Sequence, residues 1–203
     1  MSLSPLQLAL LYFIFFASGV SSLISEITWN RMLVLIVGNT ITATSMIVAA
    51  FMGGLAAGSY WGGRTFSKLR PSLIPYSFLE ACIGFYVILS PLFFNLFANL
   101  FAELAPAFAG STILPLVRLA ITFASLFAPA FLMGATFPAI IAGTAHADPK
   151  ARASRTGYLY SINTIGAALG CLGAGYLLLP RVGSQQTLVW AFLFNQVIKN
   201  NKN

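Results

Sequence analysis

The sequence predicts an all-α protein, a polytopic bundle of about six transmembrane helices that forms one domain over residues 1–203. Of its 203 residues, 58% are hydrophobic and only 7% are charged, and the mean hydropathy is +0.85. A soluble domain carries about 25% charged residues, so this chain has too few polar groups to cover a surface in water. Several apolar stretches also reach the roughly 20 residues that a membrane-crossing helix needs. A transmembrane barrel would instead need alternating segments of about 10 residues, and the sequence has none.

Six apolar stretches separated by polar or basic connections are the expected membrane segments. They run over about residues 6–25, 40–61, 75–94, 113–141, 157–179 and 187–198. The fourth contains Pro115, Pro129 and Pro138, and a proline inside a helix removes a hydrogen bond and kinks it. The sixth is the weakest, because "TLVWAFLFNQVI" is short for a span and contains Asn195 and Gln196.

The stretch "NLFANLFAEL" between the third and fourth segments predicts an interfacial helix over about 95–104. Asn95, Asn99 and Glu103 recur every four residues, and leucine and phenylalanine side chains fill the other face. This spacing gives a helix one polar and one apolar face, which suits the membrane surface. The alternative is a simple extension of the third segment.

The net charge of +7 does not indicate nucleic-acid binding, because the basic residues cluster between apolar segments. One side of a six-span bundle would hold Arg64, Lys68, Arg70, Lys150, Arg152, Arg155, Lys199 and Lys202, which leaves Arg31, Arg118 and Arg181 for the other. Cytoplasmic loops are enriched in lysine and arginine. We therefore expect the first side, with both termini, to be cytoplasmic.

Glycine stripes in the second and fifth segments predict close helix packing. Small residues on one helix face let two backbones approach each other in lipid. The two stripes consist of Gly54, Gly58 and Gly62, and of Gly166, Gly170 and Gly173. Neither stripe follows a strand, as a glycine-rich dinucleotide site would require.

Polar residues inside the expected spans are the candidate functional groups, because charges in the bilayer core are costly and face a bundle interior or water. Glu80 lies about one turn into the third segment, and Asn163 and Tyr160 lie at similar depth in the fifth. These three residues predict a polar pocket that opens toward the cytoplasm. The alternative is that Glu80 pairs structurally with Arg64 or Lys68.

The stretch "SGVSSLISEITWNRMLVLIVGN" (residues 18–39) places a second polar group near the outer end of the first segment. Glu26, Asn30 and Arg31 interrupt two apolar runs, and Arg118 lies near the outer end of the fourth segment. We expect an outer polar cluster of these four residues, in which Glu26 is shielded from lipid and bonded to Arg118, Asn30 or the backbone. A plain interfacial cap, with Trp29 in the aromatic belt, and a substrate site are the alternatives.

No catalytic set, metal site or cofactor site is evident in the sequence. His146 is the only histidine, so a cluster of histidine ligands is excluded and a histidine-based triad is implausible. Cys82 and Cys171 lie far apart in apolar segments and read as buried thiols. We therefore expect that the chain is not an enzyme.

Four stretches together give the chain a family resemblance. "SGVSSLISEITWNRMLVLIVGNT", "FMGGLAAGSYWGGR", "LMGATFP" and "GYLYSINTIGAALGCLGAGYLLLPRVG" occur in this order over about residues 8–190. Together they resemble the membrane region of fused spermidine-synthase-like proteins, which is similar to half of a major facilitator transporter. The resemblance implies a bacterial inner (cytoplasmic) membrane and polyamine-related chemistry. That family's soluble aminopropyltransferase-like domain and its binding motifs have no counterpart here, so no catalytic residue carries over.

Three functions remain open at the level of sequence. The chain is expected to be a non-enzymatic accessory subunit of the membrane that associates with another membrane protein or a second copy. Alternatively, it is a half-transporter or sensor for a small cationic solute such as a polyamine. As a third possibility, it anchors a separate, soluble aminopropyltransferase chain. The lipid bilayer is an expected partner in all three.

Overall fold

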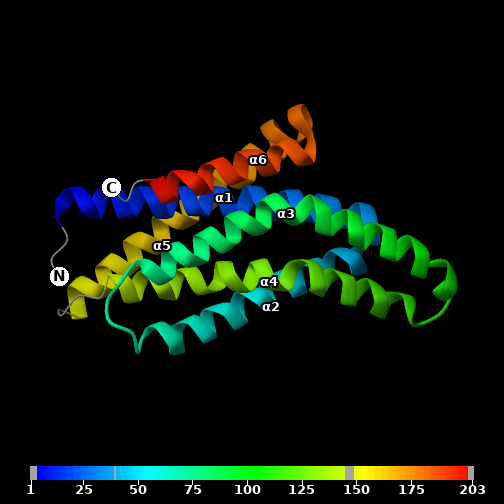
Figure 1. Cartoon of the computed structure of the whole chain (residues 1–203), viewed down its shortest axis with the longest axis horizontal. Coiled ribbons are helices and arrows are strands. Elements are labelled where there is room, and N and C mark those ends of the chain that lie inside the picture. The colour runs from blue at the N-terminus through cyan, green and yellow to red at the C-terminus, as the bar shows by residue number, and fades with distance from the viewer. Residues whose placement is uncertain (1–3, 39, 145–148, 201–203) are drawn as a thin grey trace.

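The computed structural model describes residues 4–38, 40–144 and 149–200, and these residues form a helical bundle (Figure 1). The long helices are α1 (Pro5–Val37), α2 (Ile41–Phe66), α3 (Ile74–Leu104), α4 (Leu114–Gly143), α5 (Pro149–Leu172) and α6 (Leu179–Asn200). A short 3-10 turn, Pro106–Phe108, precedes α4, and a π-helical turn, Gly173–Leu178, joins α5 to α6. The predicted fold class, an all-α bundle of about six helices, is confirmed.

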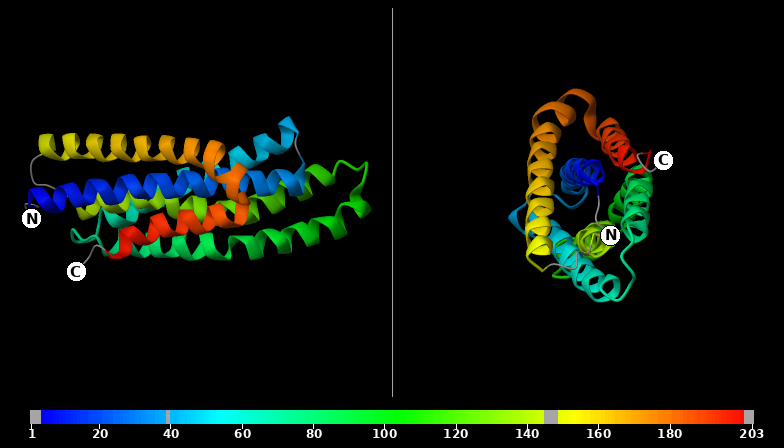
Figure 2. Two further views of the ribbon diagram at one scale, coloured as in Figure 1. Left: turned by 90° about the horizontal axis from the view of Figure 1, so that it is seen from above. Right: turned by 90° about the vertical axis from the view of Figure 1, so that its left-hand side faces the viewer.

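Five helical stretches of the described chain are long and apolar enough to cross a membrane. Four of them are α1 to α4, and the fifth, Lys150–Asn195, runs through α5, the π turn and α6. Gly183 has non-helical torsions (φ 75°, ψ 178°) inside this last stretch. Figure 2 shows the chain reversing there, so α6 runs back along the bundle and ends where α1 begins. The fifth stretch therefore consists of two antiparallel helices.

The predicted ends of the first and third segments show the largest boundary errors, and both place a helix end at polar residues; the fifth and sixth helices also begin about eight residues earlier than predicted. The first helix does not stop near residue 25 but continues to Val37, where Gly38 takes a positive φ of 98°. The third helix absorbs residues 95–104, so the extension is the correct alternative and no separate interfacial helix forms. Neither stretch contains a proline or glycine that would break the backbone, and polarity alone does not end a helix.

The prolines of the fourth segment have different roles. Pro115 occupies the first turn of α4, where its missing N–H group costs nothing, so it introduces no kink. Pro129 and Pro138 lie inside the helix. Pro91 also lies inside α3.

Helices α1 and α4 form the interior of the bundle. Helix α1 packs against α5 and α6 and less extensively against α3, whereas α2 and α3 pack on α4. The end-on view in Figure 2 shows α1 surrounded by the other helices. With 33 residues, α1 is about 50 Å long at 1.5 Å per residue, longer than the hydrocarbon core of about 30 Å.

The first three helices and the last three pack in corresponding ways. Helix α2 packs on α4, and α5 packs on α1; likewise α3 packs on α4, and α6 packs on α1. Helices α1 and α4 cross the bundle in opposite directions (Figure 2). The two groups of three helices are thus arranged as an inverted pair, with α3 and α6 in contact between them.

The glycine stripes make the tightest of these contacts. A Cβ atom added at Gly54 or Gly58 would collide with the α4 backbone near Phe127 and Phe131, and one at Gly62 would press on Ala135. In the same way, Gly166 and Gly170 lie against the α1 backbone at Phe16 and Val20. Gly173 has nothing within 4 Å of such an atom, so the second predicted stripe is one residue too long.

Candidate functional site

Glu80 is the centre of a buried hydrogen-bond group that joins three helices. Its side chain, on α3, is only 4% exposed. One carboxylate oxygen accepts a hydrogen bond from the Ser18 hydroxyl of α1 at 2.6 Å, and the other accepts one from the Asn195 amide of α6 at 2.7 Å. A buried carboxylate needs such donors, and here they come from helices at both ends of the chain.

Helices α1, α3 and α6 pack closely around the hydrogen bonds of Glu80. A Cβ atom added at Gly84 would lie 2.5 Å from Oδ1 of Asn195, so the absence of a side chain there lets α6 approach α3. The Ser21 hydroxyl donates to the backbone oxygen of Ala191 at 2.8 Å, which adds a second link between α1 and α6. The buried Tyr76 hydroxyl lies near Glu80 but makes no hydrogen bond of good geometry within the described residues.

This geometry corrects the predicted role of Glu80. Within the part of the chain that the structure describes, its hydrogen bonds come from Ser18 and Asn195 and not from a basic residue. The expected alternative partner Arg64 instead lies over the Tyr60 ring, 4.5 Å from its centroid. Glu80 is therefore bonded within the bundle rather than paired at the loop.

The predicted pocket of Glu80, Asn163 and Tyr160 is not assembled. Asn163 lies on α5 and contacts α1 at Gly19, whereas Glu80 contacts α1 from α3. Tyr160 is 61% exposed and meets the Phe137 ring edge-on at 5.8 Å. Helix α1 lies between α3 and α5, so the three side chains do not converge.

Sequence reasoning missed Ser18 and Asn195 as partners of Glu80. Asn195 is 115 residues from Glu80, and Ser18 is 62 residues away, so no local pattern links them. Asn195 itself was a signal, because an asparagine in an apolar span needs a polar partner. Glu80 was a candidate for that partner, since it is the acid nearest the middle of another predicted span.

Glu26 has a different environment at the other end of the bundle. It is half-buried and lines a cavity of about 90 Å³ among α1, α2 and α4, together with Asn30 and Thr44. Apolar side chains, including Phe51 and Leu126, form the remaining wall. Among the described residues, no hydrogen bond or ion pair reaches Glu26, so the predicted bond from Arg118 or Asn30 is not made.

The other members of the predicted outer cluster are dispersed. Arg118 packs over the Phe101 ring at 5.9 Å, and its Nε atom is buried without a partner in the described chain. Arg31 is exposed. Trp29 is fully buried and donates to the Ser90 hydroxyl at 2.9 Å, so it stabilises the α1–α3 contact and does not belong to an aromatic belt.

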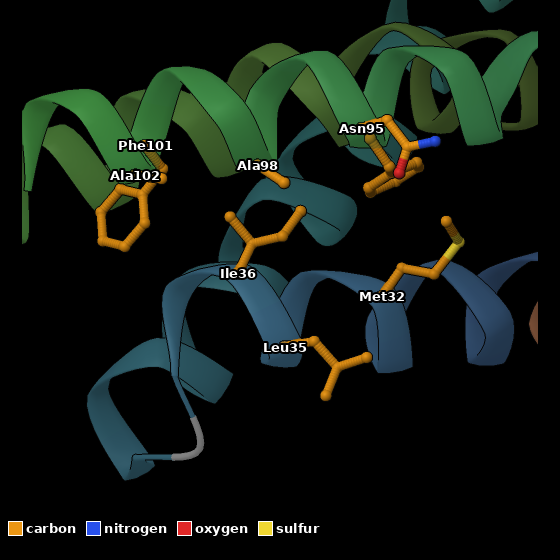
Figure 3. Close-up of a pocket in the computed structure, with 8 residues that line it drawn as sticks. Met32, Leu35, Ile36, Asn95, Ala98, Phe101 and Ala102 are labelled. Carbon is orange, nitrogen blue, oxygen red and sulfur yellow. The ribbon is translucent and has the colours of Figure 1, made fainter.

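Two larger cavities lie at opposite ends of the bundle. One, of about 360 Å³, is a groove between the C-terminal parts of α1 and α3, lined by side chains such as Met32, Ile36 and Phe101 (Figure 3). Asn95 supplies the polar side chain in this groove. The other, of about 500 Å³, lies where α2 and α4 end and α5 begins.

The polar groups offer hydrogen bonding and charge rather than an assembled reaction centre. No group of three or more histidine, cysteine or acidic side chains within the described residues could hold a metal ion. Glu80 is occupied by two donors, whereas Glu26 faces a cavity. Of the two, Glu26 is the carboxylate that lines a cavity.

No protein-family model, no curated protein and no solved structure matches this chain.

Proposed function

We propose that the chain is a non-enzymatic subunit of the inner membrane that works in association with another chain. The observation that carries this proposal is the inverted pairing of α1–α3 with α4–α6. Major facilitator transporters contain such inverted three-helix repeats within each six-helix half. A transport path in that architecture lies between two halves, and the described helices supply one of them.

Exposed small residues on α2 and α5 support association. Ala49 and Ala56 are exposed two turns apart on α2, and Ser161 and Ala168 are exposed two turns apart on α5. Small residues on a membrane helix surface permit close approach by another helix. The inner glycine stripes are already used within the bundle, so these outer positions are the ones available to a second six-helix unit, either a second copy or a different membrane protein.

Photo-crosslinking in native membranes tests the association directly. A photoreactive residue at Ala56 or Ala168 should give protein adducts. The matched control positions are Phe85 and Leu92 of α3, which are each 66% exposed and also two turns apart, and they should react with lipid only. Native mass spectrometry should show an oligomer in mild detergent. A stable monomer that transports solute in liposomes would contradict the proposal.

The proposed orientation places the start of α1 and the end of α6 in the cytoplasm. The support is that the α2–α3 connection, with Lys68 and Arg70, and the first turns of α5, with Arg152, lie at this end of the bundle (Figure 1), together with the positive-inside rule. A cysteine placed at Gly183 should react with an impermeant reagent from outside, and one placed at Lys150 should not. The reverse labelling pattern would overturn this orientation.

The resemblance to the membrane region of spermidine-synthase-like proteins makes a soluble aminopropyltransferase one candidate partner. It does not make this chain the catalyst, because Glu80 is bonded inside the bundle and the described residues contain no nucleotide-binding fold. We therefore expect no aminopropyl transfer from decarboxylated S-adenosylmethionine to putrescine by the purified chain. Measurable turnover would contradict this part of the proposal.

A half-transporter or sensor for a small cation is the second candidate function. The cavity of about 90 Å³ at Glu26 favours it, because a carboxylate with Asn30 and Thr44 beside it could receive an ammonium group. In this case, putrescine should raise the thermal stability of the protein, and Glu26→Gln should abolish that effect. An equal response from the variant would exclude Glu26 as the binding group.

A further inference from the structure

The cavity at the basic end of the bundle combines an apolar wall with a cationic rim. It has a volume of about 500 Å³ and lies between the C-terminal ends of α2 and α4 and the first turns of α5. Phe66, Leu69, Pro138 and Ile141 supply most of the apolar wall, and Arg152 lines the cavity from α5. Cavities of about 300–1,000 Å³ are typical of small-molecule sites.

Arg152 differs from the neighbouring basic residues because its side chain lines the cavity. Arg155 donates to the backbone oxygen of Thr144 at 3.4 Å, at the C-terminal end of α4, where a cation complements the helix dipole. Arg64 lies over the Tyr60 ring. Among the described residues that line the cavity, Arg152 carries the charged side chain.

We propose that this cavity binds an anionic phospholipid, with the phosphate near Arg152 and an acyl chain along the apolar wall. Basic pockets between transmembrane helices bind anionic headgroups, and the cavity is at a helix end, where headgroups and hydrocarbon meet. A soluble phosphate would leave the wall of Phe66, Leu69 and Ile141 unused. A zwitterionic lipid would bring no net negative charge to Arg152.

Gly63 provides a way to fill the cavity without disturbing the fold. It lines the cavity, and a Cβ atom added there has nothing within 4 Å, so Gly63→Leu should project a side chain into the lipid position. Gly53 is the matched control, because it lies on the same helix, also has nothing within 4 Å of an added Cβ atom, and lines none of the cavities described above.

The variant Arg152→Gln tests the contribution of the positive charge to lipid binding, and Arg31→Gln is its control. Arg31 is exposed on α1, toward the opposite end of the bundle from the cavity. A membrane-surface arginine contributes about 1 kcal/mol to the binding of anionic lipid, which corresponds to roughly a fivefold change in affinity. The Gly63→Leu variant should weaken binding at least as much, because it occupies the acyl position.

The measurement is native mass spectrometry of the full chain in mild detergent, titrated separately with phosphatidylglycerol, phosphatidylcholine and glycerol 3-phosphate. We expect phosphatidylglycerol to bind most tightly, and its binding to fall in Arg152→Gln and Gly63→Leu while Arg31→Gln and Gly53→Leu match the unmodified protein. Circular dichroism checks that all four variants are folded, and Arg152→Lys, which keeps the charge, should retain most of the binding.

Three results would overturn the proposal. Equal binding of phosphatidylcholine would remove the role of charge, and equal binding of glycerol 3-phosphate would remove the role of the acyl wall. Equal losses in the control variants would show that the lipid binds elsewhere. None of these outcomes depends on whether the chain has a protein partner, so the lipid site and the proposed subunit function are tested separately.

Discussion

The two carboxylates within apolar, membrane-length helices, Glu80 and Glu26, have contrasting hydrogen-bond environments. Glu80 lies where three helices meet and receives hydrogen bonds from Ser18 and Asn195. Glu26 lines a cavity among α1, α2 and α4, and no described residue bonds to it. The first acid therefore contributes to holding the bundle together, whereas the second contributes little to stability and leaves a polar atom available. The two acids therefore differ in their burial and, more sharply, in their hydrogen-bond partners.

The largest effect should come from Glu80→Ala. This change removes the acceptor of two buried donors and leaves a hole between α1, α3 and α6. Unsatisfied buried donors and lost packing should lower the free energy of unfolding by about 2–4 kcal/mol. Unfolding in mixed detergent micelles, followed by circular dichroism, measures the loss. Glu80→Gln keeps the volume and should cost less; equal stability of the alanine variant and the unmodified protein would refute the structural role.

Gly84→Ala should have the next largest effect on the same group. The added methyl group would lie too close to Asn195 and would push α6 from α3, at a cost of about 1–3 kcal/mol. Gly53→Ala is the control, since nothing lies within 4 Å of the added carbon. Similar unfolding curves for the two alanine variants would mean that Asn195 moves aside without loss.

Ser18→Ala should lower stability by a smaller amount. It removes one hydrogen bond to Glu80 and leaves the bond from Asn195. Hydrogen bonds between membrane helices contribute about 0.6 kcal/mol on average, with a maximum near 1.7 kcal/mol. A double-mutant cycle with Asn195→Ala would measure how strongly the two donors are coupled through the carboxylate. A coupling energy of zero would contradict a shared acceptor.

Glu26→Gln should change stability least, within about 0.5 kcal/mol, because it breaks no hydrogen bond and conserves volume. Chemical reactivity should separate the two acids more clearly. A lipid-soluble carbodiimide should modify Glu26 in the folded protein and leave Glu80 unmodified, as read by peptide mass spectrometry. Modification of both acids at the same rate would show that Glu80 is accessible and would end the contrast.

Much of the fold could be predicted because it follows from local properties of the chain. Apolar length identified the helices, and the spacing of Gly54, Gly58 and Gly62 identified a packing surface that the structure places against α4. The ends of α1 and α3 were harder, because Glu26 and the asparagines after residue 94 suggested helix ends. Neither interrupts backbone hydrogen bonding, so both helices continued.

The candidate sites could be predicted only as single residues. Glu80 and Glu26 stood out because acids are rare in apolar spans. Their partners depended on which helices become neighbours, and nothing local to the third segment indicates that α6 returns beside it. The rotation of α1 likewise decided that Trp29 faces Ser90 in the interior. Side-chain direction within a bundle is set by packing among distant segments, which composition and spacing do not specify.

The position of α1 has a consequence for how the protein is made. Helix α1 precedes the other described helices in the chain and lies in the interior of the bundle, yet Ser21 meets Ala191 and Glu80 meets Asn195 only after α6 has been translated. At about 5–20 residues per second, the 115 residues between Glu80 and Asn195 correspond to a wait of roughly 6 to 23 seconds. During this interval, Glu80 of the nascent chain would have the Ser18 hydroxyl as a donor but would lack its second donor, Asn195. Such a chain is a natural target for membrane quality-control proteases, and ribosome stalling before α6 should lead to rapid degradation.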